Sequence, residues 1–220
     1  MRLALALAAM LALAVATPDT TAAHAWDGRY SVYRSGSFSG QVNNYTCVGA
    51  SVQMMLNVIH QRSDQWASNQ KMYWRYAQRH SRYPVTDNGA DPKGWALALR
   101  HWNGGYYTVA KAASVQASLR TAARRMRLTG KPVGLLVHRG GHAWVMTGFA
   151  ATADPARTND YRVTAVQAMG PLWPSGTING SPYDPGPKTW IRTRDLKQKF
   201  TPYRQPYSAA WNGLLITVVP

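Results

Sequence analysis

The sequence contains one cysteine, Cys47, at the point where a segment rich in Gly, Ser, Asn and Tyr gives way to a strongly apolar one. Such a lone thiol is either a buried, inert side chain or a working nucleophile. Residues 48–60 place apolar side chains at helical spacing over most of the circumference, which predicts a buried central helix. Cys47 is therefore expected in the first turn of this helix, where unpaired backbone N–H groups and the helix dipole favour a thiolate.

A nucleophilic thiol needs a general base, and His142 is the strongest candidate. Two glycines precede it and a strand-like apolar run, residues 143–149, follows, so that it opens a strand after a tight turn. Taken alone, it could equally be a histidine that only ends a turn. His138, across the two glycines, is interpreted as an ordinary strand-end residue. Three further histidines near the C-terminal ends of predicted helices are interpreted as structural: His60, His80 and His101.

Gln41 lies six residues before Cys47, in a segment that must pass close to the start of the helix. Its side-chain amide can donate a hydrogen bond to the oxyanion that forms when Cys47 attacks a carbonyl carbon. The backbone N–H of Cys47 would be the second donor. Together with His142, these residues predict acyl-transfer chemistry by a thiol.

Composition excludes several classes of function. A chain of 220 residues with 45% hydrophobic residues is neither disordered nor of low complexity. The sequence has no Glu, which excludes the metalloprotease motif with a Glu between two helical histidines. The Gly-x-Ser-x-Gly elbow and the phosphate-binding loop are also missing. One cysteine and scattered histidines form no metal-ligand pattern, so neither a cofactor nor a metal is expected.

Residues 1–25 have the pattern of a cleavable secretory signal, with one positive charge, an apolar stretch over residues 3–15 and a small-x-small step at Ala23-His24-Ala25. A membrane anchor is the alternative, but the apolar stretch is shorter than the roughly 20 residues that a spanning helix needs. We therefore expect a secreted protein that begins near Trp26.

The chain is strongly basic, with 25 Lys and Arg against nine Asp and a formal net charge of +16. Such an excess attracts polyanions. For a secreted protein these are anionic cell-wall polymers, a membrane surface or acidic glycans, although the charge can also be a solvated surface adapted to anionic surroundings. Nucleic-acid recognition motifs are missing, and specific nucleic-acid binding is not expected. We expect a peptide or protein substrate and a monomeric chain, with association to a cell wall as an option.

Helical patterns precede strand patterns along the chain. After the helix that follows Cys47, helices are predicted over residues 64–79, 93–101 and 114–127. Strands are predicted over residues 133–137, 143–147, 161–169 and 214–219, with a Pro- and Gly-rich loop over residues 171–187 and a basic surface segment between the last two. This order predicts one α+β domain, residues 26–220, with a mostly antiparallel sheet.

The motif Gln41-x5-Cys47, followed by Gly140-Gly141-His142-Ala-Trp-Val-Met-Thr-Gly-Phe on a strand, resembles the papain-like cysteine peptidases. Within them it is similar to the bacterial group related to the peptidases that process double-glycine leader peptides of bacteriocins, the thirty-ninth cysteine-peptidase family. The similarity spans roughly residues 41–174. It implies a papain-like fold in which the central helix bearing the cysteine packs on the sheet. It also implies Cys47 as nucleophile, His142 as general base and acid, and Gln41 as oxyanion donor.

One position departs from that family, in which a strand after the catalytic histidine ends in an Asp or Asn that orients the imidazole. Gly170, before Pro171, stands at this place. Three residues of the preceding loop remain as candidates for the orienting group: Asp154, Asn159 and Asp160. A Cys–His pair can also work without a third member at reduced efficiency, because that member mainly sets the tautomer and orientation of the imidazole.

Three functions therefore remain open. The leading one is a secreted thiol hydrolase that cleaves amide or peptide bonds. The second is the same chemistry on the peptide stem of peptidoglycan, which the net charge favours. The third is a catalytically inactive papain-like protein that binds peptides, wall polymers or a partner, because glycine stands at the orienting position.

Overall fold

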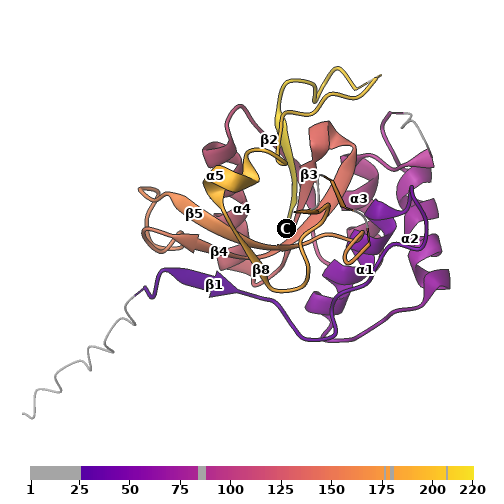
Figure 1. The fold of residues 1–220 in the computed structure, drawn as a ribbon, viewed down its shortest axis with the longest axis horizontal. Coiled ribbons are helices and arrows are strands. Elements are labelled where there is room, and N and C mark those ends of the chain that lie inside the picture. Colours follow the sequence, from indigo (N-terminus) through magenta and orange to yellow (C-terminus); the bar gives the residue numbers. More distant parts are fainter. Residues whose placement is uncertain (1–25, 84–87, 176, 179–180, 207) are drawn as a thin grey trace, which may run out of the picture.

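A computed structural model describes residues 26–83, 88–175, 177–178, 181–206 and 208–220 of the chain (Figure 1). The predicted secretory signal, residues 1–25, lies outside the described residues. Within the described ranges, no helix has both the length and the apolar character needed to cross a membrane.

The main sheet has seven strands in the order β2-β9-β3-β4-β5-β8, and β1 pairs with β4. All its strand pairs are antiparallel. Its strands are β1 (Arg29–Ser31), β2 (Thr108–Ala112), β3 (Val133–Val137), β4 (His142–Ala151), β5 (Val163–Met169), β8 (Thr189–Arg192) and β9 (Leu215–Val219). A small separate sheet joins β6 (Thr177–Ile178) to β7 (Ser181–Pro182). The prediction of an α+β fold with a mostly antiparallel sheet is confirmed.

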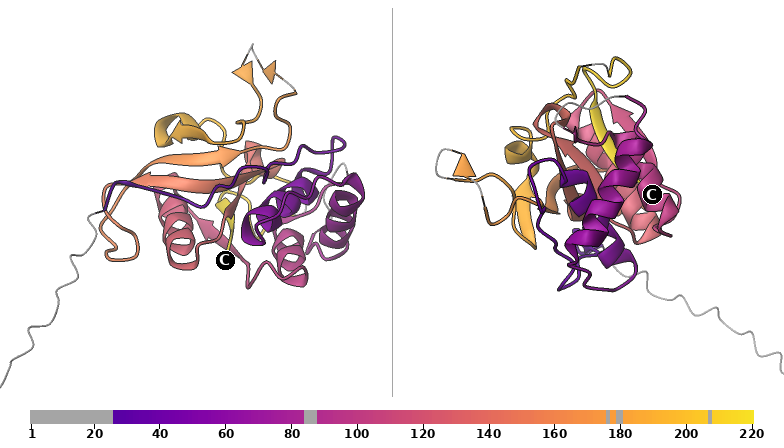
Figure 2. Two further views of the ribbon diagram at one scale, coloured as in Figure 1. Left: turned by 90° about the horizontal axis from the view of Figure 1, so that it is seen from below. Right: turned by 90° about the vertical axis from the view of Figure 1, so that its right-hand side faces the viewer.

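Helices cover both faces of this sheet. The helices are α1 (Cys47–Ile59), α2 (Ala67–Arg79), α3 (Pro92–His101), α4 (Val115–Thr129) and the short α5 (Thr193–Leu196). Side chains of α1, α2 and α3 form one core with one face of β3, β4 and β9, and side chains of α4 and α5 form a second core with the opposite face. In the left view of Figure 2, the yellow strand β9 lies between α4 and the group α1–α3.

Alternation along β3 explains the two cores. Leu136 packs in the core of α1, whereas its neighbours Leu135 and Val137 pack in the core of α4, because successive strand residues point to opposite faces. Gly134 lies against the indole of Trp95 on α3, where an added Cβ would be 2.5 Å from a ring carbon. The sheet is therefore buried on both sides at its centre, which is where the functional residues are attached.

The predicted helices agree with α1 to α4 within a few residues, because their apolar periodicity and end signals are local. Asp91 accepts a hydrogen bond from the backbone N–H of Gly94 at the start of α3, and Gly130 ends α4 with a φ of 67°. The four predicted strands correspond to β3, β4, β5 and β9. Three strands of the main sheet were not predicted, namely β1, β2 and β8. They are short and half-exposed, and they depend on pairing with distant partners.

Candidate active site

Cys47 is the first residue of α1, as predicted, and its side chain is partly exposed. Most of the helix behind it is buried, which holds its start firmly against the sheet. The side chain of Thr46 makes no capping hydrogen bond, so the first backbone N–H groups of α1 keep no side-chain partner there. The thiol thus stands at a helix terminus that favours an anion.

His142 is the first residue of β4, and its ring is buried beside Cys47. Its Nε2 lies 3.0 Å and 2.8 Å from the two carboxylate oxygens of Asp184. Cys47 lies close enough to the ring of His142 to contribute to the raised pKa of that imidazole. Because Nε2 belongs to the carboxylate, Nδ1 is the nitrogen that is left for the thiol. The imidazole therefore connects the sulfur to a carboxylate, as a general base with an orienting group must.

Two opposing effects set the pKa of His142. Burial acts to lower the pKa, but hydrogen bonds and negative charge from Asp184 and Cys47 outweigh burial and raise the pKa from 6.5 to about 9. The protonated imidazole is therefore favoured at neutral pH. A thiolate beside an imidazolium is the state from which thiol hydrolases attack their substrates.

The orienting carboxylate belongs to Asp184, which the sequence analysis did not identify. The side chain of Asp184 is buried and accepts two further hydrogen bonds, from the indole Nε1 of Trp144 at 2.7 Å and from the backbone N–H of Leu172 at 2.6 Å. These donors satisfy its oxygens in a buried position and hold the carboxylate in place beside His142.

Gly170 and Asp184 are complementary. A Cβ added at Gly170 would lie 2.4 Å from Cγ of Asp184, and the backbone N–H of Gly170 donates to the carbonyl of Pro185 at 2.9 Å. The carboxylate of Asp184 thus occupies the space that a side chain at position 170 would need. Gly170, whose presence suggested an inactive site, is the residue that leaves space for a carboxylate from another segment.

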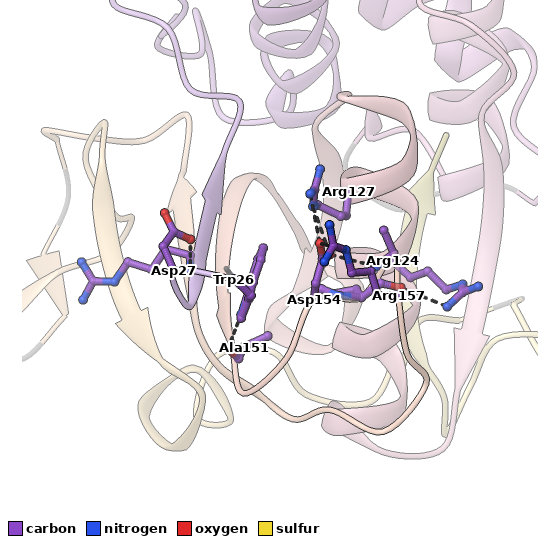
Figure 3. A network of polar contacts seen from close by, with 10 residues as sticks. Trp26, Asp27, Arg124, Arg127, Ala151, Asp154 and Arg157 are labelled. Atoms are coloured by element: carbon purple, nitrogen blue, oxygen red, sulfur yellow. Dashed lines mark hydrogen bonds and ion pairs between the residues drawn. The ribbon is translucent and has the colours of Figure 1, made fainter. Parts of the chain in front are cut away.

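The three residues proposed from the sequence to orient His142 lie elsewhere, and that prediction is wrong. Asp154 binds the guanidinium of Arg127 on α4, and the side chain of Asn159 accepts a hydrogen bond from Arg124, also on α4. Figure 3 shows Asp154 lying against Arg127. Asp160 is bonded only locally, its backbone N–H donating to the side chain of Thr158. These contacts hold the loop between β4 and β5 on α4.

Gln41 is engaged in hydrogen bonds with Asn43 and Pro171. Its backbone N–H donates to the carbonyl of Pro171 at 2.8 Å, which ties its segment to the strand end beside Gly170. Its side-chain Nε2 donates to the carbonyl of Asn43 at 2.7 Å, and its Oε1 is buried without a partner among the described residues. The amide has a second N–H, which is left for another acceptor.

A buried glutamine, Gln70 of α2, holds the segment that carries Gln41. Its Oε1 accepts from the backbone N–H of Val42 at 2.8 Å and from the hydroxyl of Thr46 at 3.2 Å. Its Nε2 donates to the carbonyl of Gly40 at 2.9 Å. The side chain of Gln70 thus holds the backbone on both sides of Gln41, in the segment that leads to Cys47.

Cys47 and His142 open onto a pocket of about 210 Å³, which we call the active-site pocket. Gln41 is not among its lining residues. Besides Cys47 and His142, the lining consists of Asn44, Tyr45, Val48, Gly89, Ala90, Leu136, Gly140, Gly141, Ala143 and Gln205. Many of these lining residues are Gly or Ala, which leave the backbone accessible. Such a pocket is suited to an extended peptide that presents one carbonyl to the sulfur.

His138 is closer to the site than its interpretation as a strand-end residue implied. Its ring stacks on Tyr183 with centroids 4.5 Å apart, and Tyr183 lies 5.5 Å from the ring of His142. Burial and the positive charges of His142 and Lys199 lower the pKa of His138 to about 4. A neutral His138 therefore stacks on Tyr183, whose ring lies next to that of His142.

The other three histidines make packing contacts away from Cys47, in agreement with their structural interpretation. Nε2 of His60 lies 3.2 Å from the carbonyl of Trp102, and Nδ1 of His80 lies 2.8 Å from the carbonyl of Tyr76. His101 stacks on the ring of Tyr76 at 4.3 Å.

Comparison of the chain with protein-family models and with curated proteins finds no match. Within the residues that the structure describes, no group of three or more His, Cys, Asp or Glu side chains could hold a metal ion. The geometry around Cys47 is thus the basis on which a function is assigned.

Proposed function

We propose that this protein is a papain-like thiol hydrolase that cleaves amide or peptide bonds. The observation that carries the proposal is the buried hydrogen bond that Nε2 of His142 donates to Asp184, next to a cysteine at the start of α1. A helix that begins with the nucleophile and packs on an antiparallel sheet, with the base at the start of a strand, also supports a papain-like architecture.

The proposed reaction begins with the thiolate of Cys47 attacking the carbonyl carbon of the substrate. The carbonyl oxygen becomes an oxyanion, which the backbone N–H of Cys47 and the amide of Gln41 stabilise. His142 gives its Nδ1 proton to the leaving amine as the C–N bond breaks, and a thioester remains. The imidazole then takes a proton from water, whose oxygen attacks the thioester and restores the thiolate.

Asp184 supplies what the sequence lacked at position 170. Its bond to Nε2 directs Nδ1 of His142 toward the sulfur and stabilises the imidazolium. The hypothesis of an inactive binding protein was based on the missing orienting group at Gly170. A carboxylate in that place removes the motivation for the hypothesis and favours an active enzyme.

The pH dependence of Cys47 alkylation by iodoacetamide tests the proposal. We expect rapid alkylation well below the pKa of about 8.5 of a free thiol, because His142 stabilises the thiolate. His142→Ala should remove the low-pH reaction, and His80→Ala, which changes an exposed histidine that does not line the active-site pocket, should retain it. Alkylation of the unaltered protein that follows an ordinary thiol titration would contradict the proposal.

Turnover of casein tests the role of Gln41 as oxyanion donor separately from the reactivity of the Cys47 thiolate. Gln41→Ala should lower turnover roughly 10²-fold or more, since one oxyanion donor is lost, and leave the alkylation profile unchanged. If turnover is unaffected, Gln41 is not the donor.

The net charge of +16 favours a second substrate class, the peptide stem of peptidoglycan at an anionic wall. Secretion, suggested by residues 1–25, and association with a wall or membrane surface belong to this part of the proposal. Purified sacculi digested in preference to casein would identify the wall peptide as substrate, and the reverse preference would identify a general peptidase.

A further inference from the structure

A second pocket, of about 520 Å³, lies beside the turn that carries His142. Its lining residues are Arg139, Thr201, Pro202, Tyr203, Arg204, Asn212 and Gly213. Residues that are neighbours in the chain line the two pockets. Gly140 and Gln205 line the active-site pocket, and Arg139 and Arg204, which directly precede them, line the second pocket. We call the second pocket the arginine pocket.

Hydrogen bonds connect the backbones of the two arginines. The backbone N–H of Arg139 donates to the hydroxyl of Thr201 at 3.0 Å, and its carbonyl accepts from the backbone N–H of Arg204 at 2.8 Å. The same carbonyl accepts from the side chain of Gln205 at 3.3 Å. The two cationic side chains therefore start from fixed points on adjoining segments at the border of the active-site pocket.

A close backbone approach also constrains this turn. Gly140 has a φ of 82°, and a Cβ there would lie 2.2 Å from a ring carbon of Tyr203. Only glycine adopts this conformation so close to an aromatic ring without strain. Packing of Tyr203 under the turn thus keeps the arginine pocket and the active-site pocket in one arrangement.

Among the described residues, no acidic side chain lines the arginine pocket. Arg139 and Arg204 are the charged residues of its lining, and both are exposed. Within the described ranges, neither guanidinium takes part in an ion pair or a hydrogen bond. A pocket beside Trp26 differs, since two aspartates line it together with its three arginines. Two free guanidinium groups at a cleft are suited to a carboxylate, which they can bind through paired N–H groups.

We propose that the arginine pocket binds a carboxylate of the substrate, so that the protein prefers peptides with an acidic group near the bond that is cleaved. This inference rests on the proposed hydrolase function, because it assigns to the arginines a part of the same substrate. The carboxylate can come from an Asp or Glu side chain or from the C-terminus of a peptide, and both present the same oxygens.

Binding to the Cys47→Ala protein tests this subsite without turnover. Three series of N-acetylated Gly/Ala/Ser heptapeptides are titrated by calorimetry: amidated peptides with one Glu at successive positions, the same peptides with Gln, and the Gln peptides with a free C-terminal carboxylate. We expect the best Glu peptide, or the free-carboxylate peptide, to bind roughly tenfold more tightly than its neutral counterpart. Which series shows the gain identifies the source of the carboxylate.

The double variant Arg139→Gln/Arg204→Gln should abolish this gain and leave neutral peptides unaffected. Arg75→Gln/Arg79→Gln on α2 is the matched control, because it removes the same charge at exposed positions that line neither pocket. The gain should also shrink with added salt. Equal binding of acidic and neutral peptides, no binding by any peptide, or a gain that survives in the double variant would overturn the inference. Failure of the hydrolase proposal is detected separately, by the alkylation profile of the unaltered protein.

Discussion

Two aspartates with little exposed surface, Asp154 and Asp184, lie in the segments that precede and follow β5. Asp154 pairs with the guanidinium of Arg127 on α4 at 3.0 Å, whereas Asp184 pairs with the imidazole of His142 at 2.8 Å. The loop of Asp154 directly follows β4, which made it the closer candidate in sequence for the bond to His142. The structure assigns that bond to the more distant residue.

The partner of each carboxylate determines what it can do. An arginine stays charged at all relevant pH values, so the pair of Asp154 and Arg127 holds a loop on a helix and transfers no proton. An imidazole gains and loses a proton near neutral pH, so the pair of Asp184 and His142 can take part in proton transfer. Burial alone does not distinguish a structural carboxylate from a chemical one.

Removing the two carboxylates should have very unequal consequences for activity. Asp184→Ala is expected to lower casein turnover by about 10²- to 10⁴-fold, because His142 loses its orienting partner. Asp154→Ala should change turnover by less than about twofold. Steady-state kinetics on both variants, with circular dichroism to establish that they are folded, checks this contrast. Comparable losses in the two variants would show that the comparison is wrong.

Moving the carboxylate to position 170 is a sharper test of the site. Asp184→Gly should lose activity as Asp184→Ala does, and the double variant Gly170→Asp/Asp184→Gly should recover at least about tenfold of it, because one space serves either side chain. Gly170→Asp alone should be destabilised by about 1–3 kcal/mol through overcrowding with Asp184. Turnover and urea unfolding measure the two effects, and a double variant no more active than Asp184→Gly would argue against the shared space.

The pair of Asp154 and Arg127 should contribute to the free energy of unfolding at neutral pH. Arg127→Met leaves the carboxylate of Asp154 without its main partner, and we expect a loss of about 1–3 kcal/mol in the free energy of unfolding. Turnover per folded molecule should stay within about twofold. Arg194→Met, at an exposed ion pair with Asp195, is the control and should cost less than about 1 kcal/mol. An equal loss of unfolding free energy in both variants would show that the pair of Asp154 and Arg127 stabilises the protein no more than an exposed ion pair does.

The two pairs should also weaken at opposite ends of the pH range. The pKa of His142 is raised from 6.5 to about 9, so its contribution to stability is complete below pH 6.5 and is lost as pH rises through about 9. Burial acts to raise the pKa of Asp154, but the backbone N–H of Ala156 and the charge of Arg127 lower it overall, so its contribution is present above the ordinary pKa of 3.8 and is lost in acid.

Urea unfolding from pH 3 to pH 10 checks this difference. The stability gap between the unaltered protein and His142→Gln should narrow toward alkaline pH, and the gap to Asp154→Asn should narrow toward acid. Burial lowers the pKa of His138 to about 4, which adds a further loss of stability in acid, and this loss cancels in the comparison with Asp154→Asn. Differences in unfolding free energy that stay constant with pH would contradict the different chemistry assigned to the two pairs.

Local patterns made much of the fold and part of the site predictable. Apolar side chains at helical spacing placed Cys47 at the start of α1, and a Gly-Gly turn before an apolar run placed His142 at the start of β4. The unpredicted strands β1 and β8 pair with β4 and β5 through residues far away in the chain. They are only three and four residues long, too short to show an alternating pattern, so the pairing partner decides their conformation.

By itself, the sequence determined the types of residue available and the local conformation around each one: a thiol at a helix start, a histidine at a strand start, and an α+β order of elements. Only the tertiary structure decided that Asp184, 42 residues after His142, completes the site. Its Pro- and Gly-rich segment has no periodicity, and its position depends on the space left beside Gly170. A helix is built from neighbours in the chain, whereas a hydrogen bond between distant segments exists only once both are packed.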